Sequence, residues 1–212
     1  MRPLLIVTAV DAERDAILAG LPAGRPPVTV AAVGVGPAAA AASTARLLAL
    51  AEAAGHPYRA VLSAGIAGGF AGRASIGTVA LAARSVQADL GAESPDGWLS
   101  LDQLGLGTVA VTADPGVLAE LRARLPAAPV GDVLTVATGT GTAGRAAALA
   151  TAYPAAVAEA MEGYGVGCAA AGAGVGFGEL RAISNLVGPR DRSAWRIGEA
   201  LAALTAAAAR LA

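Results

Sequence analysis

Short apolar runs alternate with helix-like stretches along almost the whole chain, and this alternation limits the possible folds more than any other feature. Runs such as 4–7 and 130–137 have the length and composition of buried strands. The segments between them, such as 38–54, are rich in alanine and typical of helices. Regular strand–helix alternation predicts an α/β fold. We expect a three-layer sandwich around a central mixed, largely parallel sheet.

The composition is that of one globular unit with an unusual core. The 212 residues fit a single domain, 1–212, and they are 55% hydrophobic but only 3% aromatic. Much of the hydrophobic fraction is alanine, so the core must depend on close backbone approach. The formal net charge is −1, with no block of like charge. We therefore expect no nucleic-acid partner and no membrane partner.

The rare side chains exclude several kinds of chemistry. Cys168 is the single cysteine, which excludes an internal disulfide and a cysteine-ligated zinc. Its neighbours are glycine and alanine, so we expect a buried, unreactive thiol. His56 is the single histidine, and we expect neither a metal nor a cofactor. The apolar run at 4–10 is too short for a signal peptide or a membrane span, which indicates a soluble cytoplasmic protein.

Two acidic residues stand at positions where chemistry is expected. Glu13 follows the first predicted strand and begins a predicted helix. It either complements the helix dipole or faces a ligand at the strand–helix junction. Glu162 lies in a long stretch of small apolar residues. It either points to water from a surface helix together with Glu159, or ends a short strand at a pocket, because an isolated carboxylate is costly elsewhere.

Glycine-rich segments follow several of the predicted strands. Residues 63–69 form a predicted loop whose backbone N–H groups can face a ligand, and 138–142 form a second one. Neither contains the lysine of a nucleotide-triphosphate loop. Residues 34–37 resemble the start of a dinucleotide fingerprint without its third glycine, and a tight turn explains them equally well. Residues 85–105 are expected to be a long irregular excursion that forms a lid or an interface.

Four segments in order resemble the purine nucleoside phosphorylase/nucleosidase superfamily. They are A-V-D-A-E-R at 9–14, S-A-G-I-A-G-G at 63–69, A-E-A-M-E-G at 158–163 and R-A-I-S-N at 181–185. The likeness covers nearly the whole chain and is greatest to the hydrolytic branch, which includes the methylthioadenosine/S-adenosylhomocysteine nucleosidases. It implies a nucleoside phosphorylase-like fold and cleavage of an N-glycosidic bond in a purine nucleoside.

The resemblance also implies roles for individual residues of this chain. Glu13 matches the carboxylate that activates the attacking water, and Glu162 matches the acid that holds the ribose hydroxyls. Asn185 matches the residue that faces the imidazole nitrogen of the leaving base, which completes the expected catalytic set. The matches for substrate binding are Gly65, Ile66, Ala67, Gly139, Thr140, Met161, Arg181 and Ser184.

Hydrolysis is favoured over phosphorolysis by the charges expected at the nucleophile site. A phosphorylase attracts a phosphate dianion with several cationic or N–H donors. Residues 61–72 contain no arginine, Glu13 would repel phosphate, and Arg181 alone is a weak clamp. Phosphorolysis is the alternative. A purine-binding module without catalysis is a second alternative, although it has no need of two carboxylates at one sugar.

Two departures from the family pattern bear on the substrate. Asn185 stands where the adenosine-type nucleosidases have aspartate, and an amide donates to a ring nitrogen and a 6-oxo oxygen without transferring a proton. We expect a 6-oxopurine base, with a methylthioadenosine-type substrate as the alternative because asparagine also pairs with adenine. Ile66 replaces a serine of the nucleosidases. Members of the superfamily commonly self-associate, so we expect a homodimer or a larger homo-oligomer, with 85–105 contributing to the contact.

Overall fold

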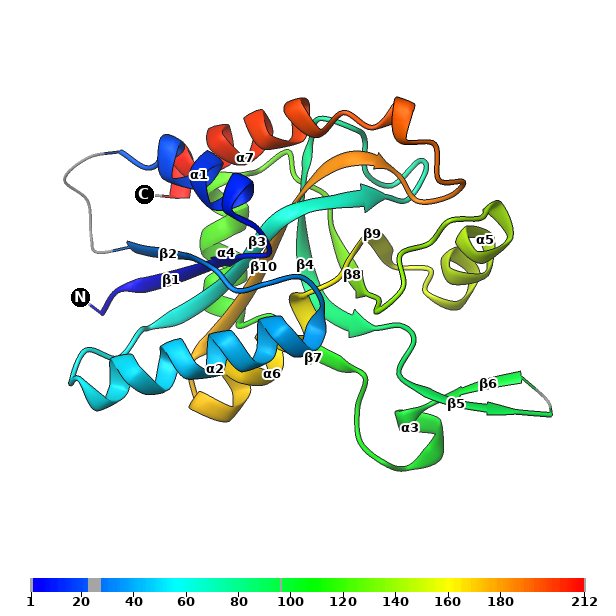
Figure 1. The fold of residues 1–212 in the computed structure, drawn as a ribbon, viewed down its shortest axis with the longest axis horizontal. Coiled ribbons are helices and arrows are strands. Elements are labelled where there is room, and N and C mark those ends of the chain that lie inside the picture. The colour runs from blue at the N-terminus through cyan, green and yellow to red at the C-terminus, as the bar shows by residue number, and fades with distance from the viewer. Residues whose placement is uncertain (1, 23–27, 96, 212) are drawn as a thin grey trace.

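Strands and helices alternate through residues 2–22, 28–95 and 97–211, which the computed structural model describes (Figure 1). The main sheet contains β1 Leu4–Thr8, β2 Val28–Ala32, β3 Ala60–Gly69, β4 Val79–Gln87, β7 Ala110–Thr112, β8 Val130–Thr135, β9 Ala156–Ala160 and β10 Gly176–Leu186. β5 Gly91–Ser94 and β6 Gly97–Ser100 form a separate antiparallel hairpin. The α/β class predicted from the sequence is confirmed.

The main sheet is mixed and curves back on itself. Its order is β10-β4-β8-β9-β3-β1-β2, and β10 also pairs with β3. Strands β3, β10, β4, β8 and β9 therefore close into a ring, from which β1 and β2 extend. The β3–β10, β4–β8 and β8–β9 pairs are parallel, whereas β10–β4 and β3–β9 are antiparallel. The mixed sheet is confirmed, the ring was not predicted, and the three-layer description stays a prediction.

Helices cover the sheet in two groups. The described helices are α1 Asp11–Gly20, α2 Pro37–Ala53, α3 Leu101–Leu104, α4 Pro115–Arg124, α5 Ala143–Ala152, α6 Gly163–Ala173 and α7 Ile197–Leu211, with a short 3₁₀ turn η1 Arg192–Ala194. One group is formed by α1, α4 and α7, and the other by α2 and α6. Alternation along β1 turns Ile6 to the core under α1, α4 and α7, and turns Leu5 and Val7 to the core under α2 and α6. In Figure 1, α1 and α7 lie above β1 and β2, and α2 and α6 lie below them.

The small residues act as the composition predicted. A Cβ added to Gly165 of α6 would collide with the carbonyl of Pro37, and one added to Gly167 would lie 2.9 Å from a methyl of Val111. α6 is therefore in backbone contact with α2 and close to β7. In such packing glycine contributes by leaving room rather than by its intrinsic helix propensity.

Three expectations are corrected. Residues 63–69 are not a loop: they continue β3, because pairing with β10 satisfies their backbone groups over this length. Residues 85–105 are largely ordered into the end of β4, the β5–β6 hairpin and α3, which project from the body (Figure 1). Cys168 is exposed, since it lies on the face of α6 that is turned away from the sheet.

No helix in the described ranges is long and apolar enough to cross a membrane.

Candidate active site

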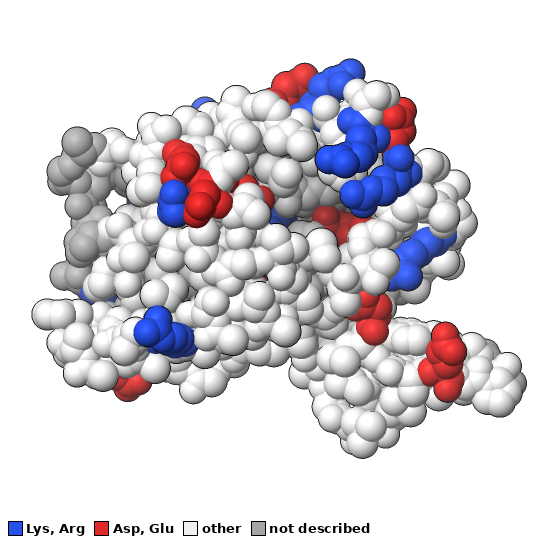
Figure 2. Space-filling view, viewed as in Figure 1, with Lys and Arg blue, Asp and Glu red and all other residues white. Residues whose placement is uncertain are grey.

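A cavity of about 410 Å³ lies where several strands of the main sheet end. Its walls come from the residues after β1, the end of β3, the loop after β8, the end of β9 and the end of β10. Open α/β sheets bind ligands at the carboxyl ends of their strands, and small-molecule sites measure about 300–1,000 Å³. Figure 2 shows a hollow with acidic atoms inside it between α5 and the segment that joins β10 to α7.

Glu13 joins the first turn of α1 to this cavity. Its Oε2 accepts hydrogen bonds from the backbone N–H of Ala9 at 2.9 Å and of Val10 at 3.2 Å. Its Oε1 accepts one from Ile66 N–H of β3 at 2.8 Å. The side chain is only 3% exposed and lines the cavity. The two interpretations of this acid are therefore compatible: it accepts hydrogen bonds at the start of its helix and it lines the cavity, while its contact with a ligand stays a prediction.

Glu162 lies two residues after the end of β9 and immediately before α6. It accepts from the backbone N–H groups of Gly36 and Met161, each at 3.3 Å, and from Arg181 Nη1 at 3.2 Å. Gly36 has a φ of +91°, which favours glycine, so the turn at 34–37 directs a backbone donor at Glu162. The short-strand interpretation of this stretch is correct, and the surface-helix alternative is wrong.

Arg181 lies beneath the cavity, and each of its three guanidinium nitrogens donates a hydrogen bond. Nε donates to Glu179 Oε1 at 2.8 Å, and Nη2 donates to Ser63 Oγ at 3.0 Å. With Nη1 on Glu162, each guanidinium nitrogen has an acceptor. Burial disfavours the charged form, but the carboxylates of Glu179 and Glu162 outweigh it and raise the pKa of Arg181.

Gly65 explains how Glu13 and Arg181 approach each other. A Cβ at this position would lie 2.7 Å from Glu13 Oε1 and 2.8 Å from Arg181 Nη1. Because Gly65 has no side chain, β3 leaves the space in which Glu13 of α1 and Arg181 of β10 approach each other. Gly65 was expected to face the substrate, but neither it nor Arg181 lines the cavity wall, and both support the residues that do.

Glu179 was not expected at the site and lies two residues before Arg181 on β10. Its side chain is fully buried, and burial raises the pKa of its carboxyl, with Arg181 opposing part of that effect. Residues two apart on a strand share a face, so the sequence could have predicted that Glu179 lies beside Arg181. Together Glu179, Arg181 and Glu162 form a buried chain of charges under the cavity.

Ser184 and Asn185 line the cavity side by side. Neighbours on a regular strand point to opposite faces, but the β10–β3 pairing shifts register between Ile183 and Asn185. Ser184 Oγ lies 2.8 Å from Asn185 Oδ1, and Asn185 Nδ2 donates to the Leu186 carbonyl at 2.9 Å. This arrangement leaves the second N–H of the amide for a ligand.

Glu159 is a further acid in the cavity. Its Oε1 accepts from Thr140 N–H at 2.8 Å and its Oε2 from Thr140 Oγ1 at 2.5 Å. These bonds hold the loop after β8, including Gly139, against the end of β9. Positions 159 and 162 are three residues apart, a spacing that also suits one face of a helix. The sequence alone therefore did not show that Glu159 lies on a strand.

The structure brings most of the expected residues into one cavity. Those that line it are Glu13, Ile66, Ala67, Gly139, Thr140, Met161, Glu162, Ser184 and Asn185. Lining residues that were not expected at the site include Val35, Glu159, Val187 and Trp195, and Arg190 also reaches the mouth. Among the described residues no group of histidine, cysteine and acidic side chains has the arrangement of a metal site.

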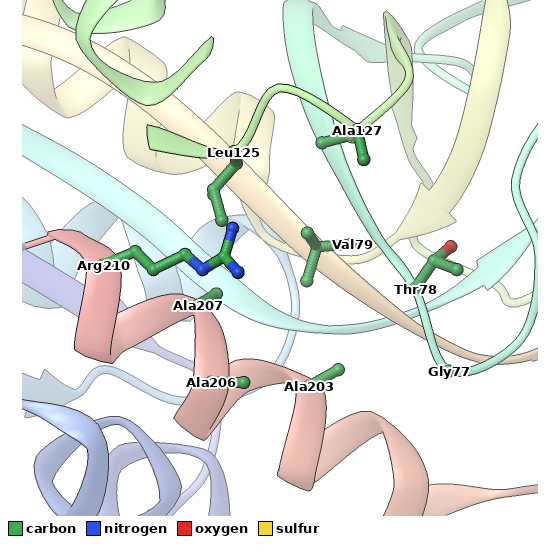
Figure 3. A pocket seen from close by; sticks show the side chains of 10 residues that line it. Gly77, Thr78, Val79, Leu125, Ala127, Ala203, Ala206, Ala207 and Arg210 are labelled. Atoms are coloured by element: carbon green, nitrogen blue, oxygen red, sulfur yellow. The ribbon is translucent and has the colours of Figure 1, made fainter. Parts of the chain in front are cut away.

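A second cavity, of about 280 Å³, lies between α7, the end of α4 and the start of β4. Figure 3 shows Arg210 reaching toward Leu125 beside three alanines of α7, with Val79 opposite. Its described lining contains no acid, histidine or cysteine. The acids and the amide expected for catalysis line the first cavity instead.

Residues 12–212 match the model of the phosphorylase superfamily, and the chain belongs to this superfamily. It is 52% identical to the futalosine hydrolase of Streptomyces coelicolor, over 99% of this chain and 94% of that protein. It is 47% identical to the futalosine hydrolase of Acidothermus cellulolyticus, over 98% and 89% of the two chains.

Solved structures support the fold. The futalosine hydrolase of Helicobacter pylori superimposes with a TM-score of 0.78 at 19% identity, over 99% of this chain and 95% of that one. The methylthioadenosine/S-adenosylhomocysteine nucleosidase of Colwellia psychrerythraea, solved with adenine, gives 0.78 at 18% identity, over 99% and 92%. At these identities the likeness establishes the fold alone.

Proposed function

We propose that this protein is a nucleosidase that hydrolyses the N-glycosidic bond of futalosine, which releases hypoxanthine and dehypoxanthine futalosine in menaquinone biosynthesis. The observation that carries the proposal is that Glu13, Glu162 and Asn185 line one cavity. They come from three distant parts of the chain, yet the acids suit a sugar and the amide suits a purine. The high identity to two futalosine hydrolases over the full chain supports the same substrate.

The sugar lies against Glu162 in this proposal. Departure of the base gives the ribose oxocarbenium character, which enzymes stabilise with nearby carboxylates. Glu162 accepts hydrogen bonds from the ribose hydroxyls and places negative charge near the developing cation. Arg181 and the Gly36 N–H hold that carboxylate in position. Met161 lies beside it in the cavity wall.

Water is the nucleophile, and Glu13 takes its proton. All three nitrogens of Arg181 are already bonded to Glu179, Glu162 and Ser63, and Arg181 does not line the cavity, so it is not placed to clamp a phosphate dianion. The acids Glu13, Glu159 and Glu162 line the same cavity and repel such an anion. These two facts support hydrolysis over phosphorolysis.

The base is held by Asn185 and Ser184, with the backbone of Gly139 and Thr140 nearby. The amide of Asn185 donates to the imidazole nitrogen or the 6-oxo oxygen of hypoxanthine and does not transfer a proton. Leaving-group stabilisation at this position is therefore by hydrogen bonding. Ser184 fixes the amide by donating to its Oδ1.

The test is a product assay on futalosine, inosine and methylthioadenosine, each with and without phosphate. We expect free hypoxanthine from futalosine at the same rate under both conditions, and methylthioadenosine turnover at least about tenfold lower in kcat/KM. A requirement for phosphate contradicts hydrolysis, and equal cleavage of methylthioadenosine contradicts the base preference. Binding without release of base indicates a purine-binding module.

We also propose that the chain acts as a single domain, residues 1–212, in the cytoplasm and as a homodimer or larger homo-oligomer. The β5–β6 hairpin supports self-association because an isolated two-stranded hairpin is marginally stable in water. Trp98 of β6 and Leu106, two residues after α3, are 41% and 72% exposed. A second copy of the chain that packs against them would bury both.

A further inference from the structure

The mouth of the active-site cavity differs chemically from its interior. Among the described residues that line the cavity, Arg190 is the only basic side chain and Trp195 is the only aromatic one. Both belong to the segment that joins β10 to α7, whereas the acids lie on the other walls. Figure 2 shows basic atoms gathered over this segment, beside the hollow that contains the acidic atoms.

The segment is tied to the cavity at both of its ends. Arg190 N–H donates to the carbonyl of Gly141 at 3.3 Å, in the loop that also contributes Gly139 and Thr140. Arg196 N–H donates to the carbonyl of Ser184 at 2.8 Å. Arg190 and Trp195 are therefore fixed relative to the groups that hold the base, although they lie at the exposed rim.

The guanidinium groups at this rim have no acidic partner. In the part of the chain that the structure describes, neither Arg190 nor Arg192 forms an ion pair. The guanidinium carbon of Arg190 lies 5.3 Å from the ring centre of Trp195, and that of Arg192 lies 5.9 Å from it. These are cation–π distances, so the indole holds two cations whose hydrogen-bond donors remain available.

We propose that Arg190 and Trp195 form a subsite for an aromatic carboxylate carried on the 5′ side of the nucleoside. The edge of an indole packs against the face of an aryl ring, and a guanidinium binds a carboxylate through two parallel hydrogen bonds. With the base and the sugar held inside, the 5′ substituent points to the mouth. The subsite rests on the proposed function, because futalosine carries a benzoate group on this side of its sugar. Arg192 supplies a second positive charge there.

The test compares futalosine with its methyl ester, which keeps the aryl ring and removes the negative charge. We expect the parent protein to prefer the acid about ten- to hundredfold in kcat/KM, the value of one charged hydrogen-bonded pair. Arg190→Gln loses most of this preference by slowing the acid, while the ester is turned over within about twofold of the parent rate. Trp195→Leu weakens acid and ester alike, because the ring contact is common to both.

The matched control is Arg196→Gln. Arg196 is exposed in the same segment, but its side chain contacts Glu199 at 3.9 Å and the Ser193 carbonyl at 3.1 Å and does not line the cavity. The control should keep the preference for the acid. If Arg190→Gln slows acid and ester equally, or neither, the subsite is refuted.

Failure of the proposed function is distinguishable from failure of the subsite. If the parent protein binds but does not cleave futalosine, calorimetry with acid and ester on the parent and on Arg190→Gln still measures the subsite. A preference for the acid that disappears in the variant supports it under those conditions as well. Binding of neither compound by the parent overturns it.

Discussion

At the scale of single residues, Glu13 combines a helix-terminal role with a place in the cavity. Its three backbone hydrogen bonds come from Ala9, Val10 and Ile66, so one carboxylate links β1, α1 and β3. A side chain held by several donors keeps a defined orientation, which general-base catalysis requires. The structural interpretation and the catalytic one therefore support each other.

Substitution of Glu13 by glutamine tests its catalytic role. A well-placed general base contributes about 10²–10⁴-fold, so we expect kcat on futalosine to fall by that factor. The amide keeps one acceptor oxygen, and the melting temperature should fall by only a few degrees. Asp15→Asn is the control, because Asp15 is exposed on the same helix and contacts Arg14. Activity of Glu13→Gln within a factor of a few of the parent contradicts the assigned role.

Glu179 gives the protein a pH dependence of stability with a definite sign. Burial raises the pKa of its carboxyl above the ordinary 4.5, so the folded state releases this proton at higher pH than the unfolded state. The folded state then binds more protons in this range, and the free energy of unfolding contributed by Glu179 falls as pH rises. That contribution is complete below pH 4.5 and is lost as pH passes through the raised pKa.

The neutral variant Glu179→Gln makes this contribution measurable. Urea unfolding of the parent and the variant at pH values from about 4.5 to 8 gives the difference in their free energies of unfolding. We expect the parent to lose stability relative to the variant as pH rises. If the parent instead gains stability relative to the variant as pH rises, Arg181 lowers the pKa of Glu179 below its ordinary value.

At the scale of elements, α6 is positioned by its glycines. A Cβ added to Gly163 would collide with the carboxylate of Glu179 on β10. The first turn of α6 therefore lies directly on the buried charges that support Arg181 and Glu162. Gly172, near the other end of the same helix, would place a Cβ in open space.

A pair of alanine substitutions in α6 separates packing from helix propensity. Gly163→Ala should destabilise the protein by about 1–3 kcal/mol, because a buried carboxylate has little room to move. Gly172→Ala should stabilise it by about 0.4–1 kcal/mol through the smaller conformational entropy of its unfolded chain. Urea unfolding of both variants measures the two values. Equal stabilities would show that Gly163 is not in tight contact with Glu179.

At the scale of the whole molecule, the projection formed by β5, β6 and α3 is the least covered part of the described structure. Figure 1 shows it extending away from the sheet and the other helices. Ser100 caps α3 by accepting from Gln103 N–H, so the projection is locally ordered. Its exposed apolar side chains are available to a second copy of the chain.

Charge placed on the projection tests self-association. We expect the parent protein to sediment as a dimer or larger species, and the double variant Trp98→Glu with Leu106→Glu to sediment near the monomer mass of 20.4 kDa. The reason is that a carboxylate buried at an apolar contact without a partner is costly. Leu50→Glu is the control, because Leu50 is 52% exposed on α2, away from the projection. A monomeric parent, or a variant that associates like the parent, contradicts the proposal.

The local sequence predicted many of the elements and the candidate catalytic groups. Buried-strand and helical patterns located β1, β8 and α2 closely, because each depends on neighbours in the chain. The motifs also indicated Glu13, Glu162 and Asn185, which share the cavity. Residues 63–69 were assigned to a loop because glycine is unfavourable in an isolated strand, and only pairing with β10 makes them β structure.

Tertiary structure alone decided how these groups meet. The closed ring of strands, the approach of Glu13 to Arg181 over Gly65, and the contact of Glu179 with Gly163 all join residues far apart in the chain. Local sequence patterns contain no information on these contacts. Each contact forms where a glycine, which has no side chain, leaves space for a side chain from another element. The sequence by itself therefore predicted which groups are candidates for catalysis, and the packing of small residues decided that they line a common cavity.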